Sequence, residues 1–143
     1  MEATFLEQEG VEDTKVGYTG GSVDSPTYKQ VCSGNTGHAE ACEVQYDPEK
    51  VSFEELLNIF FWAHDPTQLN RQGPDVGTQY RSAIFFHDKD QENSAKKLIE
   101  ELNNSGKFDR PIVTEVMAVQ KFWDAEDYHQ RYFEKNKNPI CRK

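Results

Sequence analysis

Side chains that could carry out acid–base or thiol chemistry gather in one short stretch, residues 26–42, with the sequence PTYKQVCSGNTGHAEAC. It holds a tyrosine, two cysteines, a histidine and a glutamate around glycines at Gly34 and Gly37. A second polar stretch, residues 64–82, adds another histidine, two aspartates and another tyrosine. Loops that are punctuated by glycine and rich in such groups are where binding and catalytic residues concentrate on a compact scaffold. The pattern therefore predicts a functional site built from these two loops.

Glu40 is the candidate acid of this site. Residues 40–46 alternate as a strand does, so Glu40 shares a face with Cys42, Val44 and Tyr46. If that face belongs to the core, desolvation raises the pKa of the Glu40 carboxyl toward the range of a general acid. The alternative is an exposed carboxylate where a strand begins, and the residues alone leave both interpretations open. Three further side chains are candidates to converge on Glu40, which spacing alone cannot show: Tyr28, Asp75 and Tyr80.

A metal site is a second interpretation of the same stretch. Cys32, His38, Glu40 and Cys42 are ligand types that zinc uses, but no CxxC or HxxxH spacing occurs. We therefore expect no metal. His38 and His64 are as well explained as residues that support turns and helix ends.

The third cysteine, Cys141, lies in the C-terminal segment 137–143, which we expect to be a flexible tail. Four basic residues lie close to it in sequence: Lys135, Lys137, Arg142 and Lys143. Exposure and positive charge favour the thiolate, which is the reactive form of cysteine. A mobile thiolate is also what is needed to reach a second cysteine and form a disulfide.

The elements that must position these groups alternate between helix and strand. The patterns predict strands over residues 11–18, 40–46, 81–86 and 112–119. They predict helices from Met1 to Gly10, from Ser52 to Ala63, from Asp88 to Leu102, and from Asp124 onward. With no internal repeat and no linker, residues 1–143 should form one α+β domain, a two-layer sandwich with a mixed sheet.

Composition narrows the class of protein. The 143 residues carry a formal net charge of −9, which argues against nucleic acid as a partner because phosphate binding needs clustered Lys and Arg. No apolar run approaches the roughly 18 residues of a membrane span. Three cysteines are too few for a disulfide scaffold, and no signal peptide is evident. We expect a protein of the reducing cytoplasm that binds neither nucleic acid nor membrane.

Several distinctive motifs follow one another along the chain: GYTGG at 17–21, PTY at 26–28, VCSG at 31–34, TGHAEA at 36–41, HDPTQ at 64–68, RQG at 71–73, Asp75, GTQYRS at 77–82 and AEDYHQ at 125–130. Over about residues 1–136 they resemble those of the peptide methionine sulfoxide reductase A family. The resemblance implies the ferredoxin-like α+β fold of that family, and an enzyme that reduces methionine S-sulfoxide, free or in proteins, to repair oxidative damage.

The resemblance also implies a role for each candidate residue. Glu40 matches the glutamate that supplies a proton to the sulfoxide oxygen, and Cys141 lies where a resolving cysteine is expected. The residues that match those binding the sulfoxide oxygen or an active-site water are Tyr28, Asp75 and Tyr80. No cofactor is implied. The reductant would be thioredoxin, or dithiothreitol in the test tube.

The family's nucleophile stands in a Gly-Cys-Phe-Trp segment, which residues 1–143 do not contain. The resemblance implies that it would fall a few residues before Met1, together with the strand that precedes it. We therefore expect an N-terminally truncated chain that does not turn over by the family route. A selenocysteine codon taken for a stop would produce such a late start. The alternative function is an inactive remnant, or an interaction module that binds methionine-containing proteins.

Overall fold

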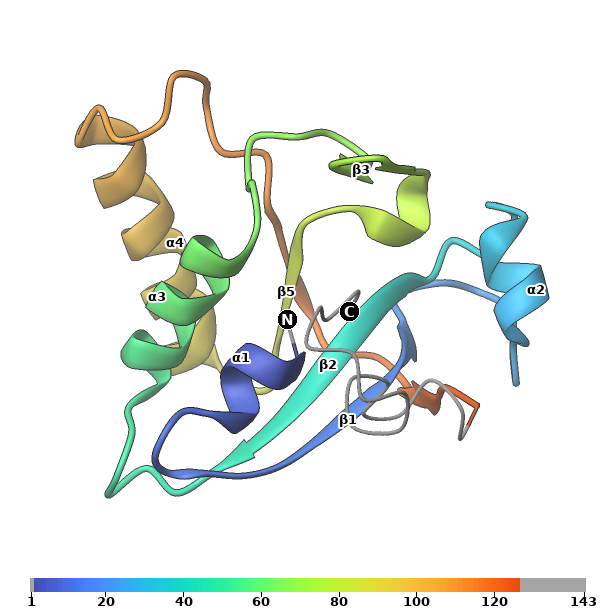
Figure 1. Ribbon diagram of the computed structural model, residues 1–143, viewed down its shortest axis with the longest axis horizontal. Helices are drawn as coiled ribbons and strands as arrows, with labels where there is room; N and C mark the ends of the chain where they lie inside the picture. Colours follow the sequence, from blue (N-terminus) through green and yellow to red (C-terminus); the bar gives the residue numbers. More distant parts are fainter. Residues whose placement is uncertain (1, 127–143) are drawn as a thin grey trace.

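The computed structural model describes residues 2–126, which form a mixture of helices and strands (Figure 1). The chain runs through these elements in order: α1 (Glu2–Leu6), β1 (Val11–Thr19), α2 (Tyr28–Cys32), β2 (Ala39–Tyr46), α3 (Phe53–Ala63), β3 (Arg71–Gln72), β4 (Asp75–Val76), a 3₁₀ turn at Thr78–Tyr80, β5 (Ala83–Phe86), α4 (Lys89–Asn104), β6 (Glu115–Ala118) and β7 (Trp123–Asp124).

The longest strands form an antiparallel sheet in the order β2-β1-β7. Successive side chains of a strand point to opposite faces of the sheet, so Val16 and Tyr18 of β1 share one face. Both are buried together with Val31 of α2. Glycine is needed at Gly17, because a Cβ there would overlap the Trp123 carbonyl oxygen and the Phe122 ring. The close approach of Gly17 is therefore what lets β7 pair with β1.

A second, parallel pair is formed by β5 and β6, and α3 and α4 pack beside it (Figure 1). Ser52 caps α3 by accepting from the Glu55 N–H at 3.1 Å, and Asp88 caps α4 by accepting from the Gln91 N–H at 2.9 Å. The apolar stripes of the two helices meet under β5, where the buried members are Leu57, Phe61, Ile84 and Ala95. A third cluster, Phe5 with Val51 and Leu56, ties α1 to the start of α3.

Most of the predicted elements are confirmed, and so is the α+β class. Antiparallel and parallel pairing both occur, but among the described residues they lie in separate sheets. Two predictions need correction. Residues 26–33, expected as loop, contain α2. Asp124, expected to open a helix, belongs to β7, because Gly17 and Tyr18 of β1 pair with Asp124 and Trp123. The remainder of that predicted helix lies outside the described residues.

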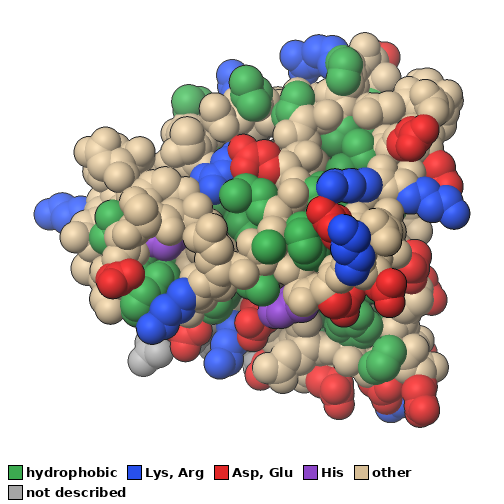
Figure 2. Space-filling view, turned by 180° about the vertical axis from the view of Figure 1, so that it is seen from behind, with side chains coloured by type: hydrophobic (Ala, Val, Ile, Leu, Met, Phe, Trp, Pro, Cys, Tyr) green, Lys and Arg blue, Asp and Glu red, His purple; other side chains and the backbone are tan. Residues whose placement is uncertain are grey.

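Acidic side chains are spread over the rear face of the molecule, in keeping with the net charge of −9 (Figure 2). Within residues 2–126, no helix has both the length and the apolar character required to cross a bilayer.

Candidate functional site

The loop that carries most of the candidate residues is held in shape by local hydrogen bonds. Thr27 and Gln30 form a reciprocal capping box, with the Thr27 hydroxyl accepting from the Gln30 N–H at 3.2 Å and the Gln30 amide oxygen accepting from the Thr27 N–H at 2.8 Å. This box starts α2, whose first and last residues are Tyr28 and Cys32. One turn of helix brings residues four apart onto one side, so the Tyr28 and Cys32 side chains are neighbours.

His38 fastens the end of the same loop and is only 2% exposed. Its Nδ1 accepts from the Gly21 N–H at 3.0 Å, so the proton of the neutral ring lies on Nε2, which donates to the Val23 carbonyl oxygen at 2.7 Å. Both ring nitrogens are therefore occupied by the backbone. The hypothesis that His38 supports a turn is confirmed, and the ring has no nitrogen left for a metal.

Arg81 connects the two polar loops that the sequence singled out. One guanidinium nitrogen donates to the Gly37 carbonyl oxygen at 3.0 Å, and another donates to the Thr78 carbonyl oxygen at 2.9 Å. The same side chain pairs with Glu115 at 3.5 Å and is only 10% exposed. Because Gly37 belongs to one loop and Thr78 to the other, Arg81 fixes the distance between them.

Tyr28 and Tyr80 meet between these loops. The Tyr28 hydroxyl is hydrogen-bonded to the Cys32 thiol, and this bond, followed by burial and by the negative charge that Cys32, Tyr80 and Glu40 can carry, holds the pKa of Tyr28 well above its ordinary value. Burial first, and then the charges of Glu40, Cys32 and Asp75, raise the pKa of Tyr80, while a hydrogen bond with Tyr28 opposes the rise. Both hydroxyls therefore stay protonated at neutral pH and can donate hydrogen bonds.

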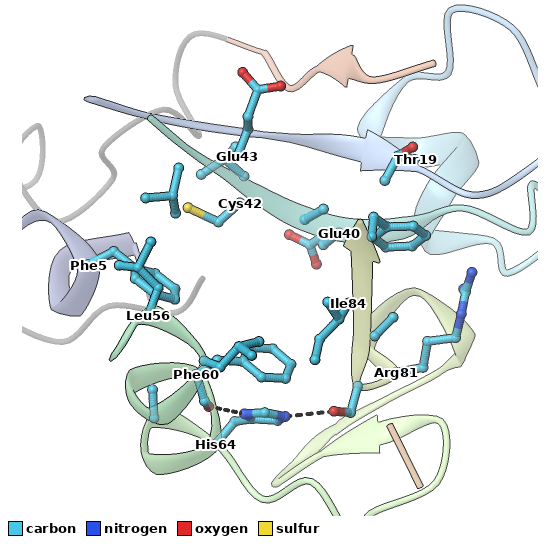
Figure 3. Close-up of a pocket in the computed structure, with 18 of the residues that line it drawn as sticks. Phe5, Thr19, Glu40, Cys42, Glu43, Leu56, Phe60, His64, Arg81 and Ile84 are labelled. Carbon is cyan, nitrogen blue, oxygen red and sulfur yellow. Dashed lines mark hydrogen bonds between the residues drawn. The ribbon is translucent and has the colours of Figure 1, made fainter. Parts of the chain in front are cut away.

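Glu40 and Asp75 lie with Tyr80 on the wall of a cavity of about 500 Å³. Glu40 is half-buried on β2, and Figure 3 shows its carboxylate directed into the cavity, with Cys42 beside it and Ile84 of β5 opposite. Cys42, Val44 and Tyr46 pack against the core, so the predicted face of the strand is confirmed. The rest of the wall is mainly apolar and comes from α1, α3 and β5.

The shape of this cavity follows from the strands that flank it. Residues 40–44 of β2 and residues 83–85 of β5 line it without a gap. Side chains alternate between the two faces of a strand, so a run of consecutive lining residues means that the edge of the strand, not one face, borders the cavity. Among the described residues, β2 ends one sheet and β5 ends another. We refer to this cavity as the inter-sheet slot.

His64 lines the slot and is held in place by a chain of hydrogen bonds (Figure 3). Its Nδ1–H donates to the Phe60 carbonyl oxygen at 2.6 Å, which leaves Nε2 to accept from the Ser82 hydroxyl at 2.7 Å. Ser82 in turn lies 2.7 Å from the Thr114 hydroxyl. His64 follows the last residue of α3, so of the interpretations that the sequence left open the structure favours support of a helix end.

The structure thus brings together four of the five predicted site residues: Tyr28, Glu40, Asp75 and Tyr80. The fifth, Cys141, lies outside the described residues. The described residues hold no cluster of three or more histidine, cysteine or acidic side chains that could bind a metal ion. The sequence pattern alone indicates no role for Arg81 and no contact of Cys32 with Tyr28. The contact of Cys32 with Tyr28 does have a signal in the sequence, because Thr27 and Gln30 have the spacing of a capping box, which predicts a helix that begins at Tyr28.

Comparison with known proteins adds the family. The family model described as peptide methionine sulfoxide reductase matches residues 1–143. A peptide methionine sulfoxide reductase MsrA from Geobacter metallireducens is 55% identical over 141 residues, which are 99% of this chain and 87% of that protein. A peptide methionine sulfoxide reductase MsrA from Haloquadratum walsbyi is 55% identical over 142 residues, which are 99% of this chain and 80% of that protein.

A solved structure shares the fold. The crystal structure of Mxr1 from Saccharomyces cerevisiae in reduced form superposes with a TM-score of 0.89 at 39% identity, covering 99% of this chain and 82% of that one. The match in sequence, in fold and over nearly the whole length leads to one conclusion. The chain belongs to the peptide methionine sulfoxide reductase family.

Proposed function

We propose that the chain is a peptide-methionine (S)-S-oxide reductase that converts free or protein-bound methionine S-sulfoxide to methionine by thiol chemistry, in the repair of oxidative damage. The observation that carries the proposal is the meeting of Glu40, Tyr80 and Asp75 on the wall of one cavity, with Tyr28 beside them. These groups can bind a sulfoxide oxygen and protonate it.

The reaction needs two thiols and one proton donor. A thiolate attacks the sulfoxide sulfur, the oxygen takes a proton from the Glu40 carboxyl, and the sulfur–oxygen bond breaks. The oxygen passes to the attacking sulfur, which is oxidised to a sulfenic acid while the sulfoxide is reduced to a thioether. A second thiol then forms a disulfide with the sulfenic acid and releases water. Overall, a sulfoxide and two thiols give a thioether, a disulfide and water.

The two tyrosines suit the first half of this reaction. A sulfoxide oxygen carries partial negative charge that grows as the thiolate attacks, so donors fixed in advance stabilise the transition state. The raised pKa values of Tyr28 and Tyr80 keep both hydroxyls protonated as such donors. Asp75 can orient a water molecule in the same pocket.

The attacking thiol has three possible sources. The family resemblance assigns it to the Gly-Cys-Phe-Trp segment, and the inter-sheet slot beside Glu40 has the form of a site for an extended segment. Within the described residues, Cys32 contacts Tyr28 and Cys42 lines the slot. We assign the resolving role to Cys141 and the recycling of the disulfide to thioredoxin in the cytoplasm, again on the family resemblance.

Single-turnover reduction of a methyl sulfoxide under excess dithiothreitol, with the two epimers resolved, tests the proposal. The 143-residue chain and a chain extended upstream by a Gly-Cys-Phe-Trp segment are assayed side by side. We expect the extended chain to reduce the S epimer alone. If the 143-residue chain also does so, substitution of Cys32 or Cys42 by serine should abolish its turnover. Reduction of the R epimer, or no reduction by either chain, would overturn the proposal.

The role of Glu40 is tested in the active chain by Glu40→Gln, with Glu43→Gln as the matched control. Both replace a carboxylate of β2 by an amide, but the Glu43 carboxylate is directed away from the slot (Figure 3). Loss of a general acid should slow the reaction by roughly 10²–10⁴-fold. The Glu43 variant should keep its rate. Equal rates for the two variants would remove Glu40 from the mechanism.

A further inference from the structure

Glu126 lies where β7, the last strand among the described residues, meets the candidate site. It follows β7, and the N–H of the preceding residue, Ala125, donates to the Val16 carbonyl oxygen of β1 at 2.9 Å. This bond extends the pairing of β7 with β1 by one residue and sets Glu126 beside α2. Glu126 is half-buried and belongs to the AEDYHQ motif, to which neither the proposed reaction nor the fold assigns a role.

The two carboxylate oxygens of Glu126 hold two different elements. Oε2 accepts from the backbone N–H of Tyr28 at 3.1 Å, and Oε1 accepts from the hydroxyl of Tyr18 at 3.3 Å. Tyr18 is a fixed point, because it is 1% exposed and lies in the middle of the sheet. The carboxylate therefore ties the first residue of α2 to the rigid part of the fold.

The backbone N–H of Tyr28 has no hydrogen-bond acceptor within α2, because it lies at the start of the helix. The first N–H groups of any helix lack a partner within the helix, and the Thr27 side chain covers only the N–H of Gln30. A carboxylate at this end also complements the partial positive charge of the helix terminus. Glu126 thus completes the anchoring of a helix only five residues long.

The anchored residue is also the one whose hydroxyl enters the site. Tyr28 receives the Glu126 contact at its backbone and meets Cys32 and Tyr80 with its side chain. A shift of the backbone at this position moves the hydroxyl by a similar amount, since the tyrosine ring is rigid. Displacements of this kind weaken binding to groups that must be held within a fraction of an ångström.

We propose that Glu126 is a positioning residue of the site, which acts through the Tyr28 backbone to hold the Tyr28 hydroxyl where a sulfoxide oxygen binds. The second half of this inference rests on the proposed function. The first half, the placement of Tyr28, does not.

Three variants of the 143-residue chain separate this role from a purely structural one. Glu126→Ala removes both contacts. Glu126→Gln keeps both, since the amide oxygen can accept from the Tyr28 N–H while the amide nitrogen donates to the Tyr18 oxygen. Tyr18→Phe is the matched control, because it removes the other contact of the same carboxylate and leaves the Tyr28 contact in place.

The first readout is the Kd for acetyl-methionine S-sulfoxide amide, measured by NMR titration, with the melting temperature recorded for each variant. We expect the alanine variant to bind about tenfold more weakly, as loss of one charge-assisted hydrogen bond gives. The glutamine variant should recover wild-type affinity within about twofold, and Tyr18→Phe should bind as the wild type does. The proposal fails if the alanine variant keeps full affinity, or if Tyr18→Phe weakens binding as much as the alanine variant.

The second readout needs no ligand. The pKa of Tyr28, followed by the NMR signal of its ring carbon, should fall toward the ordinary value in Glu126→Ala and stay raised in the other two variants. An unchanged Tyr28 pKa in the alanine variant would overturn the positioning role. If the unsubstituted chain binds no sulfoxide, the half of this inference that rests on the proposed function fails, and the Tyr28 titration still decides whether Glu126 positions that residue.

Discussion

Replacing Ser82 by alanine should cost the fold a measurable part of its stability. Ser82 is 5% exposed, and its hydroxyl joins the Nε2 of His64 at 2.7 Å to the Thr114 hydroxyl at 2.7 Å. His64 follows the last residue of α3, Ser82 immediately precedes β5, and Thr114 immediately precedes β6. Ser82→Ala leaves a half-buried acceptor on His64 and a half-buried hydroxyl on Thr114 without this partner. An unsatisfied buried group costs about 1–3 kcal/mol, so we expect a loss of about 2 kcal/mol.

The assay is urea unfolding followed by circular dichroism. With a slope of about 2 kcal/mol/M, the expected loss moves the midpoint down by about 1 M. Ser105→Ala is the control, because Ser105 also donates a hydrogen bond, to the Leu102 carbonyl oxygen, but is exposed. It should change stability by less than about 0.5 kcal/mol. An equally small loss for Ser82→Ala would mean that water replaces the hydroxyl at no cost, and would refute the reasoning.

Three further outcomes are expected. Because the pKa values of Tyr28 and Tyr80 are raised in the folded state, the stability they contribute is complete below pH ~10 and declines as the pH rises above it. Unfolding curves at alkaline pH should show this decline, and replacing both tyrosines by phenylalanine should remove it. Gly21→Ala should cost about 1–3 kcal/mol, because the added methyl overlaps the backbone of Thr36 and His38, and a melting temperature equal to wild type would contradict that contact. Extending the chain upstream by a strand that enters the inter-sheet slot should raise the melting temperature, since it would bury the apolar wall of the slot and cover two strand edges. Equal melting temperatures would show that the slot does not accept a strand.

Local signals in the sequence were sufficient for the elements that carry them. Ser52 and Asp88 precede apolar stripes of helical period, and both helices begin where these residues predict. The same kind of signal at Thr27 and Gln30 marks α2, although a run of glycines and polar residues around it favours a loop. Asp124 illustrates the opposite case, because its acidic neighbours are typical of a helix start while its backbone pairs with Gly17, more than a hundred residues earlier. Pairing at that separation overrides local preference and leaves no local trace.

The site could be predicted as a set of residues but not as a geometry. Residue types and alternation indicated Glu40 but left open whether its face of β2 is buried, and the packing of Cys42 and Val44 shows that this face meets the core. The meeting of Tyr28 with Tyr80 depends on Arg81, whose guanidinium links the two loops. Its hydrogen bond with Gly37 joins residues that are 44 positions apart in the sequence. No spacing within either loop contains that information. The role of Glu126 is equally remote, since it contacts Tyr28 across 98 residues.

The inter-sheet slot has a consequence for the heat capacity of the protein. The slot is partly open to the solvent and lined mainly by apolar side chains, so part of the apolar surface of the folded chain stays in contact with water. Apolar surface that is already hydrated in the folded state adds nothing to the heat-capacity change of unfolding, which comes from surface newly exposed to water. A segment that fills the slot would take this surface out of water. The heat-capacity change of unfolding, measured by calorimetry, should therefore be larger when the space between the two sheets is occupied.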